Sequence, residues 1–397
     1  MPKFRSALVA ATVALLVSCA SRPTTSDPSP LPQLSEVEID ATVERLRIAN
    51  DVKGLAVALV RNGEVVFSKA YGHRMVEKDL PLETNTIMYG ASLTKATFAY
   101  FIMQLVDEGI VDLDRPIGEY LQNPLPDYED YSDLSGDPRW RDLTMRKLLN
   151  HTTGFSNFRW FDGNGDYVED GKLAFYFDPG SRYAYSGEGL LLAQFVLEEG
   201  LGIDVGQEMQ ARIFDRFGMT NTSMTWREDF FDNYAHNYAT DGENVRHRVW
   251  EKVGAAGSMD TTIDDWSAFL AAVVRGDGLS EDARLEMTSP QIRIRSITQF
   301  PTLREEITDR YDGINLSYGL GWGVFDSPRG RAFFKEGHDE GTANYALCIE
   351  PEQSCILLMS NSVRAEGIFK ELVDTLFGPT SLPWRWEGYT PYNSSEE

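Results

Sequence analysis

A serine and a lysine stand three positions apart at Ser92 and Lys95, where a largely apolar stretch begins. Residues three apart lie on one face of a helix, so the Lys95 side chain can reach the Ser92 hydroxyl. A serine hydroxyl is a poor nucleophile unless a neighbouring base takes its proton, and a lysine can do so once burial and nearby cations lower its pKa. Because a capping serine beside a solvated lysine is the usual source of so short a pattern, the pair needs support from the rest of the chain.

The helix that would hold this pair is predicted by apolar residues at three- and four-residue spacing. They are Phe98, Phe101, Ile102 and Leu105, with Gly109 as the stop. Backbone N–H groups at the start of such a helix favour a developing oxyanion, which is what attack by a serine on a carbonyl group produces. The position of Ser92 therefore agrees with nucleophilic catalysis.

The remaining elements predict an α/β (α+β) fold. The capping-box pattern Ser35-x-x-Glu38 opens a first helix, and Asn62-Gly63 joins two β-rich runs as a type I′ hairpin turn. A mainly helical insertion is expected at about 91–254, then a helix opened near Thr262, three strands and a last helix at about 366–376. This order predicts an antiparallel sheet flanked by N- and C-terminal helices, with a helical subdomain beside it.

Four segments occur in the order found in one enzyme family: ASLTKATFAYFIMQLVDEGIVDLDRPIGEYL, LTMRKLLNHTTGF, DPGSRYAYSGEGLLLAQFVLEEGLG and AAGSMDTTIDDWSAFL. From about Leu34 to Gly378 the chain thus resembles the penicillin-recognising serine hydrolases. The nearest branch includes class C β-lactamases, D-alanyl-D-alanine carboxypeptidases, D-aminopeptidases and related esterases. The resemblance implies the β-lactamase/transpeptidase-like fold and three active-site motifs, S-x-x-K, Y-x-N and K-T-G or H-x-G. Ser92 and Lys95 fill the first.

Tyr185 falls at the second motif, after the family's Pro-Gly pair at Pro179-Gly180. A phenolic oxygen there can move a proton between serine, leaving group and water, and neighbouring lysines would favour its ionised form. A core tyrosine is the alternative interpretation. Gly187 stands where the family has an asparagine whose amide contacts the acyl-amide of substrates. Because glycine has no such amide, ester or small-peptide substrates are favoured over efficient β-lactamase activity.

The third motif allows two registers within FFKEGHDEGTANY, residues 333–345. The register that begins at Lys335 keeps Gly337, at a position where a side chain would block the approach of the backbone to the substrate. The register that begins at His338 puts Glu340 at the glycine position. We favour Lys335 and keep His338 as the alternative.

In the Lys335 register the lysine is a cation that holds a substrate carboxylate and supports an ionised tyrosine. Strand alternation points Lys335 and Gly337 toward the cleft and Glu336 away from it. The backbone N–H of residue 338 would join that of Ser92 as the oxyanion hole. His151, in LLNHTTGF, is expected to be a structural histidine bonded to backbone near a turn.

These motifs predict a serine hydrolase that works through an acyl-enzyme on a small ester or a D-amino-acid-containing peptide, which includes peptidoglycan stem peptides. A class C-like β-lactamase is the enzymatic alternative, and a non-hydrolytic penicillin-binding or scaffold lipoprotein is the alternative of another class. No cofactor or metal is expected. The acidic loop at Asp162–Asp166 lacks EF-hand spacing, and no His/Cys cluster in the sequence has zinc spacing.

The N-terminus has the pattern of an export signal. Lys3 and Arg5 precede an apolar run that is too short to span a bilayer, and residues 1–18 read as a lipoprotein signal peptide. The tetrapeptide that ends at Cys19 resembles the lipobox of bacterial lipoproteins, which implies lipidation of the Cys19 thiol. An ordinary signal peptide is the alternative. The predicted location is the periplasm, on a membrane lipid anchor, and Ala20 favours the outer membrane over the inner one.

The rest of the chain divides into three parts. Residues 19–34 are rich in Ser, Thr and Pro and are expected to be a flexible tether. Residues 35–380 are the predicted hydrolase domain, and residues 381–397 a polar C-terminal tail. The formal net charge is −24, and loss of Lys3 and Arg5 with the signal leaves −26. So acidic a surface repels phosphate backbones, so no nucleic-acid partner is expected.

Two cysteines flank a turn near the C-terminus. If the segment NYALCIEPEQSCILLMSN is a hairpin, Cys348 and Cys355 lie opposite each other, close enough for a cross-strand disulfide. The sequence leaves two interpretations, a disulfide and two buried free thiols, of which the thiols are favoured.

Overall fold

The N-terminal helix and hairpin form where the sequence predicts them, in the computed structural model, which describes residues 32–394. Helix α1 (Glu36–Ala49) begins with a capping box: the Ser35 side chain accepts the Glu38 N–H, and the Glu38 carboxylate accepts the Ser35 N–H. Strands β1 (Gly54–Arg61) and β2 (Glu64–Met75) are joined by Asn62 and Gly63, whose φ angles of 50° and 75° suit a type I′ turn.

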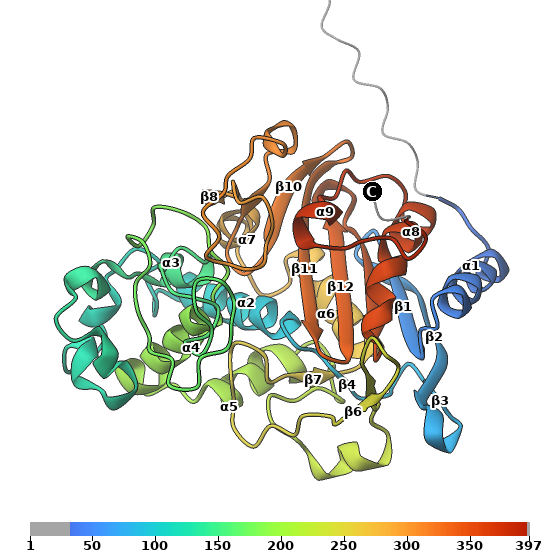
Figure 1. The fold of residues 1–397 in the computed structure, drawn as a ribbon, viewed down its shortest axis with the longest axis horizontal. Coiled ribbons are helices and arrows are strands. Elements are labelled where there is room, and N and C mark those ends of the chain that lie inside the picture. Colours follow the sequence, from blue (N-terminus) through green and yellow to red (C-terminus); the bar gives the residue numbers. More distant parts are fainter. Residues whose placement is uncertain (1–31, 395–397) are drawn as a thin grey trace, which may run out of the picture. The chain divides into compact units, whose positions relative to one another are not determined.

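A nine-stranded antiparallel sheet forms the centre of the fold (Figure 1). Its strand order is β3-β2-β1-β13-β12-β11-β10-β9-β8, so the N-terminal hairpin pairs directly with the last strand. The other strands are β3 (Leu80–Pro81), β8 (Ile292–Arg293), β9 (Ser317–Tyr318), β10 (Gly323–Ser327), β11 (Gly330–Asp339), β12 (Thr342–Ile349) and β13 (Ser354–Ser360). The predicted antiparallel sheet is confirmed.

Helices cover both faces of this sheet because its central strands alternate two buried sets of side chains. Val57 and Leu59 of β1 pack with α1 and α8 (Glu366–Leu376), the two terminal helices that the sequence predicts. Ala56 and Ala58 face the opposite way and pack with α2 (Leu93–Asp107) and α6 (Ile263–Arg275). Helix α2, which carries the catalytic candidates, is therefore buried against the sheet.

The C-terminal segment corrects the expectation of a polar tail from residue 381. Residues 384–387 form a short helix, α9 (Trp384–Glu387), and Trp384, Trp386 and Tyr389 are buried in the same core as α1 and α8. The Tyr345 hydroxyl donates to Glu387 at 2.7 Å. Burial of these three aromatic rings removes a large apolar area from water, and this gain exceeds the cost of placing the polar residues around them in the fold.

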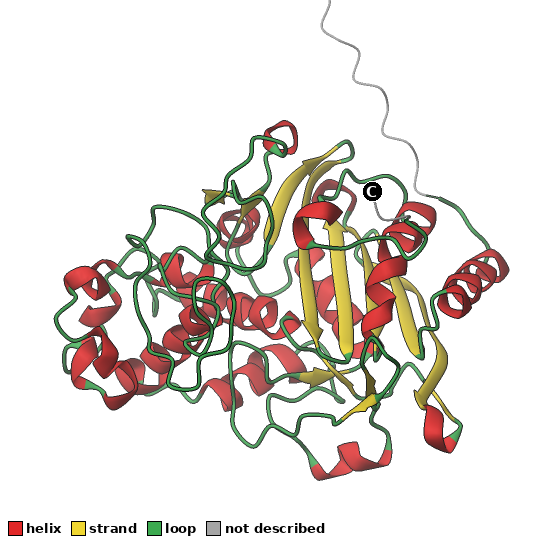
Figure 2. Cartoon of the chain, in the orientation of Figure 1, coloured by secondary structure: helices red, strands yellow, loops and turns green. Residues whose placement is uncertain are grey.

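The insertion between α2 and α6 is built from short helices and long loops (Figure 2). Its elements are helices α3 (Met145–Leu149), α4 (Gly187–Phe195) and α5 (Val205–Met209), β5 (Asn237–Tyr238) paired with β6 (Asn244–Val245), and β7 (Asp260–Thr261). Strand β7 pairs with β4 (Met88–Tyr89), which precedes α2. Helix α7 (Glu281–Thr288) follows α6. Within residues 32–394, no helix combines the length and the apolar character that a membrane crossing requires.

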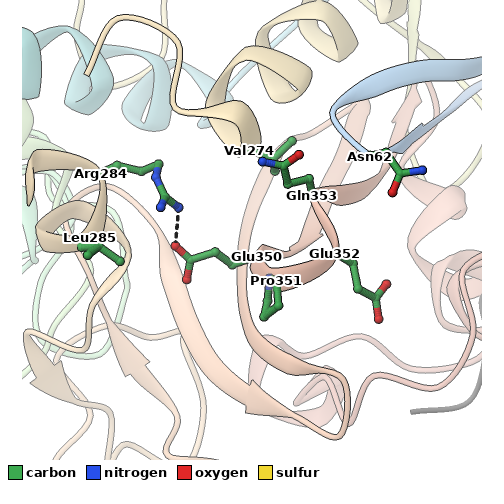
Figure 3. A pocket seen from close by; sticks show the side chains of 8 residues that line it. All are labelled: Asn62, Val274, Arg284, Leu285, Glu350, Pro351, Glu352 and Gln353. Atoms are coloured by element: carbon green, nitrogen blue, oxygen red, sulfur yellow. Dashed lines mark hydrogen bonds and ion pairs between the residues drawn. The ribbon is translucent and has the colours of Figure 1, made fainter. Parts of the chain in front are cut away.

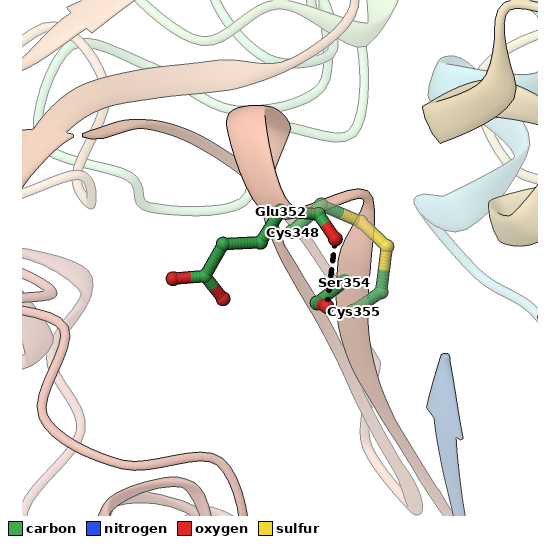
Figure 4. Close-up of a disulfide and its surroundings, with 4 residues drawn as sticks. All are labelled: Cys348, Glu352, Ser354 and Cys355. Carbon is green, nitrogen blue, oxygen red and sulfur yellow. Dashed lines mark hydrogen bonds between the residues drawn. A yellow bond between two sulfur atoms is a disulfide. The ribbon is translucent and has the colours of Figure 1, made fainter. Parts of the chain in front are cut away.

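The hairpin of β12 and β13 carries a disulfide between Cys348 and Cys355 (Figure 4). The two residues are directly opposite in register and fully buried, so the favoured interpretation as free thiols is wrong. At the tip of this hairpin, Glu350 forms an ion pair with Arg284 of α7 at 2.7 Å. Glu350 also lines a pocket with Asn62 and Gln353 (Figure 3). The third motif, at residues 335–339, lies toward the other end of β11, so this pocket is separate from the catalytic candidates.

Candidate active site

Ser92 and Lys95 meet at the N-terminus of α2, as their spacing predicts. Lys95 Nζ lies 2.9 Å from Ser92 Oγ and donates to the Ala256 carbonyl oxygen at 2.6 Å. The Ser92 side chain makes no capping hydrogen bond, so its hydroxyl remains available to the lysine. Burial, followed by the charge of Lys335, lowers the pKa of Lys95 well below its ordinary value. An uncharged amine beside a serine hydroxyl can accept its proton.

The turn that precedes Ser92 is strained and held from two sides. Ala91 has a φ of 47°, in the left-handed region that residues with a side chain seldom adopt. The Asn344 amide of β12 donates to the Tyr89 carbonyl at 2.9 Å, and the Gly90 N–H donates to the Met259 carbonyl at 2.9 Å. These bonds fix the direction in which the chain enters α2, and with it the position of the Ser92 hydroxyl.

Tyr185 lies beside the same pair, fully buried just before α4. Its hydroxyl accepts a hydrogen bond from Lys335 Nζ at 3.1 Å, and Lys95 Nζ stands 5.0 Å from its ring centroid. Burial and then the charge of Glu336 raise the pKa of Tyr185 well above its ordinary value, although a hydrogen bond with Ser92 opposes the rise. The expectation of an ionised tyrosine is therefore corrected: the phenol keeps its proton and can donate it.

Strand β11 brings the third motif to this site in the Lys335 register. A Cβ built on Gly337 would lie 2.7 Å from the Gly90 carbonyl oxygen and 3.2 Å from the Ser92 nitrogen, so only glycine fits between β11 and the start of α2. Lys335 reaches Tyr185, whereas His338 is exposed and has its ring 5.5 Å from the Phe300 ring. The structure thus groups Ser92, Lys95, Tyr185 and Lys335, while their catalytic roles stay predictions.

Glu336 departs from the expectation that it faces away from the cleft. Its carboxylate is buried and accepts from Lys335 Nζ at 2.7 Å and from the Gln299 amide at 2.9 Å, so it belongs to the hydrogen-bond network of the site. Burial opposes ionisation of Glu336, yet the charge and hydrogen bond of Lys335 lower its pKa. The signal available in the sequence was an acidic residue in the middle position of the motif.

An aromatic ring occupies the space that a side chain at Gly187 would fill. A Cβ on Gly187 would lie 2.6 Å from the Phe158 ring, and the Gly187 N–H donates to the Asn157 side-chain oxygen at 3.0 Å. Asn157 also lines a pocket of about 400 Å³ together with Phe300, whose ring centroid lies 5.6 Å from that of Tyr185. Nothing in the spacing of the motifs pointed to Asn157 or Phe300, because both come from loops outside them.

The neighbouring polar groups support the site without entering it. His151 is buried, and its Nδ1 accepts the Ser186 N–H at 3.1 Å, which agrees with the predicted structural role. Its ring packs 4.3 Å from the Tyr185 ring, centroid to centroid. The Asp162 carboxylate accepts the backbone N–H groups of Asn164 and Asp166, which is a local turn. Cys19, the predicted lipidation site, lies outside the described residues.

Comparison with known proteins shows which family the chain matches. The family model described as Beta-lactamase matches residues 39–373. Penicillin-binding protein 4* of Bacillus subtilis is 24% identical over 363 residues, which cover 83% of this chain and 74% of that protein. The lovastatin esterase of Penicillium rubens is 29% identical over 266 residues, which span 60% of each chain and so less than two thirds of the esterase.

The solved structures show the same fold. The D-alanine carboxypeptidase AmpC from Burkholderia cenocepacia superposes with a TM-score of 0.65 at 17% sequence identity. The match covers 85% of this chain and 98% of that one. At this level of identity the likeness concerns the fold, an antiparallel sheet with a helical subdomain, and leaves substrate choice to the residues of the site.

Proposed function

This chain belongs to the Beta-lactamase family and is a serine hydrolase, and from that premise we propose that it hydrolyses a small ester or a D-amino-acid-containing peptide through an acyl-enzyme on Ser92. The observation that carries the proposal is the 2.9 Å contact between Ser92 Oγ and the buried amine of Lys95. Gly187 supplies no side-chain amide, and the Phe158 ring occupies its place, so this position lacks the donor expected to hold the acyl-amide of a β-lactam.

The reaction follows from the positions of these groups. Ser92 Oγ attacks the carbonyl carbon while its proton passes to Lys95 Nζ, and the oxyanion forms near the Ser92 N–H and the backbone at Gly337 and His338. The tetrahedral adduct then expels the alcohol or amine, which takes up the proton by way of the Tyr185 hydroxyl. Water attacks the acyl-enzyme in the second half, releases the acid and restores the Ser92 hydroxyl.

The proposed location is the bacterial periplasm, with a lipid anchor on Cys19 in the outer membrane. It is supported by the lipobox resemblance and the tether composition of residues 19–34. A disulfide between Cys348 and Cys355 agrees with an oxidising compartment. Labelling of full-length protein with a radioactive fatty acid, with Cys19→Ala as control, tests the anchor directly.

Intact-mass spectrometry of residues 32–397 tests the enzymatic proposal. The protein is incubated briefly with 4-nitrophenyl acetate or with a penicillin, and Ser92→Ala is the control. We expect an acetyl adduct that depends on Ser92 and turns over, and a penicillin adduct that is absent or long-lived. Rapid turnover of penicillin would establish the β-lactamase alternative, and the absence of Ser92-dependent chemistry with either reagent would favour the scaffold alternative.

A further inference from the structure

The Lys335 ammonium is fully committed within the protein. A protonated lysine has three N–H donors. Lys335 Nζ uses them on the Tyr185 hydroxyl at 3.1 Å, the Glu336 carbonyl oxygen at 3.0 Å and the Glu336 carboxylate at 2.7 Å. The side chain is 0% exposed. No donor of this cation is left over for a substrate carboxylate.

The surrounding contacts also hold Lys335 and Glu336 together. The Glu336 carboxylate is 3% exposed, and the oxygen that binds Lys335 accepts a second hydrogen bond from the Gln299 amide at 2.9 Å. Gln299 is itself held by its backbone N–H, which donates to the Trp386 carbonyl oxygen at 2.8 Å. Separating two buried opposite charges leaves each without a partner in a medium of low polarity, which is costly. The pair therefore presents no net charge to the cleft.

Two pockets near His338 supply no cation that could replace Lys335 in binding an anion. The pocket of about 400 Å³ beside Tyr185 is mainly apolar, with Phe161, Phe300 and Pro301 in its wall, and the Phe300 ring lies 5.5 Å from that of His338. The pocket that His338 itself lines is acidic, with Asp241, Asp339 and Glu340 among its residues. The described residues that line these two pockets include no lysine and no arginine.

We propose that this site selects uncharged esters and rejects substrates with a carboxylate near the scissile bond, because Glu336 neutralises the cation that would otherwise bind that carboxylate. The inference rests on the proposed ester hydrolysis and narrows its substrate class. The apolar part of the ester occupies the pocket beside Phe300, where burial from water supplies binding energy. A peptide with a free C-terminal carboxylate next to the scissile bond is a poor substrate on this view.

The test uses two esters that differ in one charge, 4-nitrophenyl hydrogen glutarate and methyl 4-nitrophenyl glutarate. We expect kcat/KM of the wild-type protein at pH 7 to be at least about 10-fold higher for the methyl ester. The preference should persist in 0.5 M NaCl, because screening by salt weakens surface charges much more than a buried pair. Equal rates, or faster hydrolysis of the anionic ester, would overturn the inference.

Substitution of Glu336 tests whether its carboxylate causes the preference for the uncharged ester. Glu336→Gln keeps the size of the side chain and a hydrogen-bond acceptor for Lys335 but frees the positive charge, so the preference should fall by at least about 5-fold. Glu336→Thr is the second variant, should the first fold poorly. Glu199→Gln removes an exposed charge from a residue that lines neither pocket and is the matched control, with an expected change below about 2-fold. Equal effects of Glu336→Gln and Glu199→Gln would contradict a role for the buried pair.

The two proposals fail in different ways. If neither ester is hydrolysed in a Ser92-dependent manner, the proposed function is wrong. If both are hydrolysed through Ser92 without discrimination, the proposed function stands and only the inference about charge is wrong.

Discussion

Lys95 Nζ lies 2.9 Å from Ser92 Oγ and 2.6 Å from the Ala256 carbonyl oxygen, and the lysine side chain is buried. The carbonyl fixes the amine in place. Burial and then the charge of Lys335 lower the pKa of Lys95, so the amine stays uncharged at pH values at which an exposed lysine is protonated. The nucleophile is thus paired with an amine that can accept its proton.

The first prediction concerns the pH dependence of this base. Because Lys95 acts without its proton, kcat/KM should fall as the pH drops through the lowered pKa of Lys95. Lys95→Met should lower kcat about 1,000-fold. The charge of Glu336 raises the pKa of Lys95, so Glu336→Gln should move the acidic limb to lower pH. Initial rates with 4-nitrophenyl acetate across pH 5 to 9 measure this, and an unchanged limb in Glu336→Gln would contradict the assignment.

The contact between β11 and α2 predicts a strict requirement for glycine. In Gly337→Ala the new methyl group would lie 2.7 Å from the Gly90 carbonyl oxygen, so the nucleophile turn must shift. We expect a loss of about 100-fold in kcat, since small displacements of reacting groups are costly. Gly313→Ala is the matched control, because a Cβ there meets nothing within 4 Å. Similar activities of the two variants would count against a role of this contact in catalysis.

The two registers of the third motif make opposite predictions. Lys335 donates to Tyr185, whereas the His338 side chain is exposed. His338→Ala should therefore keep kcat within about 5-fold, and Lys335→Gln should lower it about 100-fold. Circular dichroism checks that both variants fold. A large loss in His338→Ala alone would show that the histidine register is the correct one.

The pocket beside Tyr185 predicts how activity depends on acyl chain length. Phe300→Ala should raise KM for 4-nitrophenyl hexanoate about 10-fold, because the longer chain loses apolar contact, and change the acetate ester less than about 3-fold. Phe231, a 57% exposed aromatic residue outside this pocket, provides the control variant Phe231→Ala. The same change in KM for both esters would argue against this pocket as the acyl site.

Glu366 predicts a pH-dependent stability. Burial raises the pKa of Glu366 from 4.5 to about 7. The stability that its protonated form contributes is therefore complete below pH 4.5 and is lost as the pH rises through 7. Glu366→Gln should leave the free energy of unfolding unchanged at pH 4 and raise it by about 2 kcal/mol at pH 8. Urea unfolding at the two pH values measures this. Glu371→Gln, in an exposed ion pair on the same helix, should change it by less than about 0.5 kcal/mol at either pH.

Local patterns predicted the elements of this fold, and distant contacts decided the rest. The capping box at Ser35, the turn at Asn62-Gly63 and the helix opened by Thr262 depend on neighbouring residues, and all three form as predicted. The spacing of Ser92 and Lys95 belongs to the same class, because one helical turn sets their separation.

The direction of the Glu336 carboxylate could not be read from strand alternation. Alternation sets where Cβ points, but a glutamate has further torsions, and its carboxylate binds the buried Lys335 ammonium and the Gln299 amide. The burial of Trp386 similarly depends on the face of a sheet formed by residues far away in the sequence. Composition alone suggested a polar tail.

The pairing of β1 with β13 means that the first and last strands of the domain are neighbours inside the sheet. Ser92 is synthesised early, but the strand that delivers Lys335 and Gly337 emerges from the ribosome only near the end of translation. Contacts between such distant segments make folding slow, since long loops must close first. A nascent or truncated chain that lacks β11 to β13 therefore carries the nucleophile without the means to use it, and hydrolytic activity begins only with the completed polypeptide.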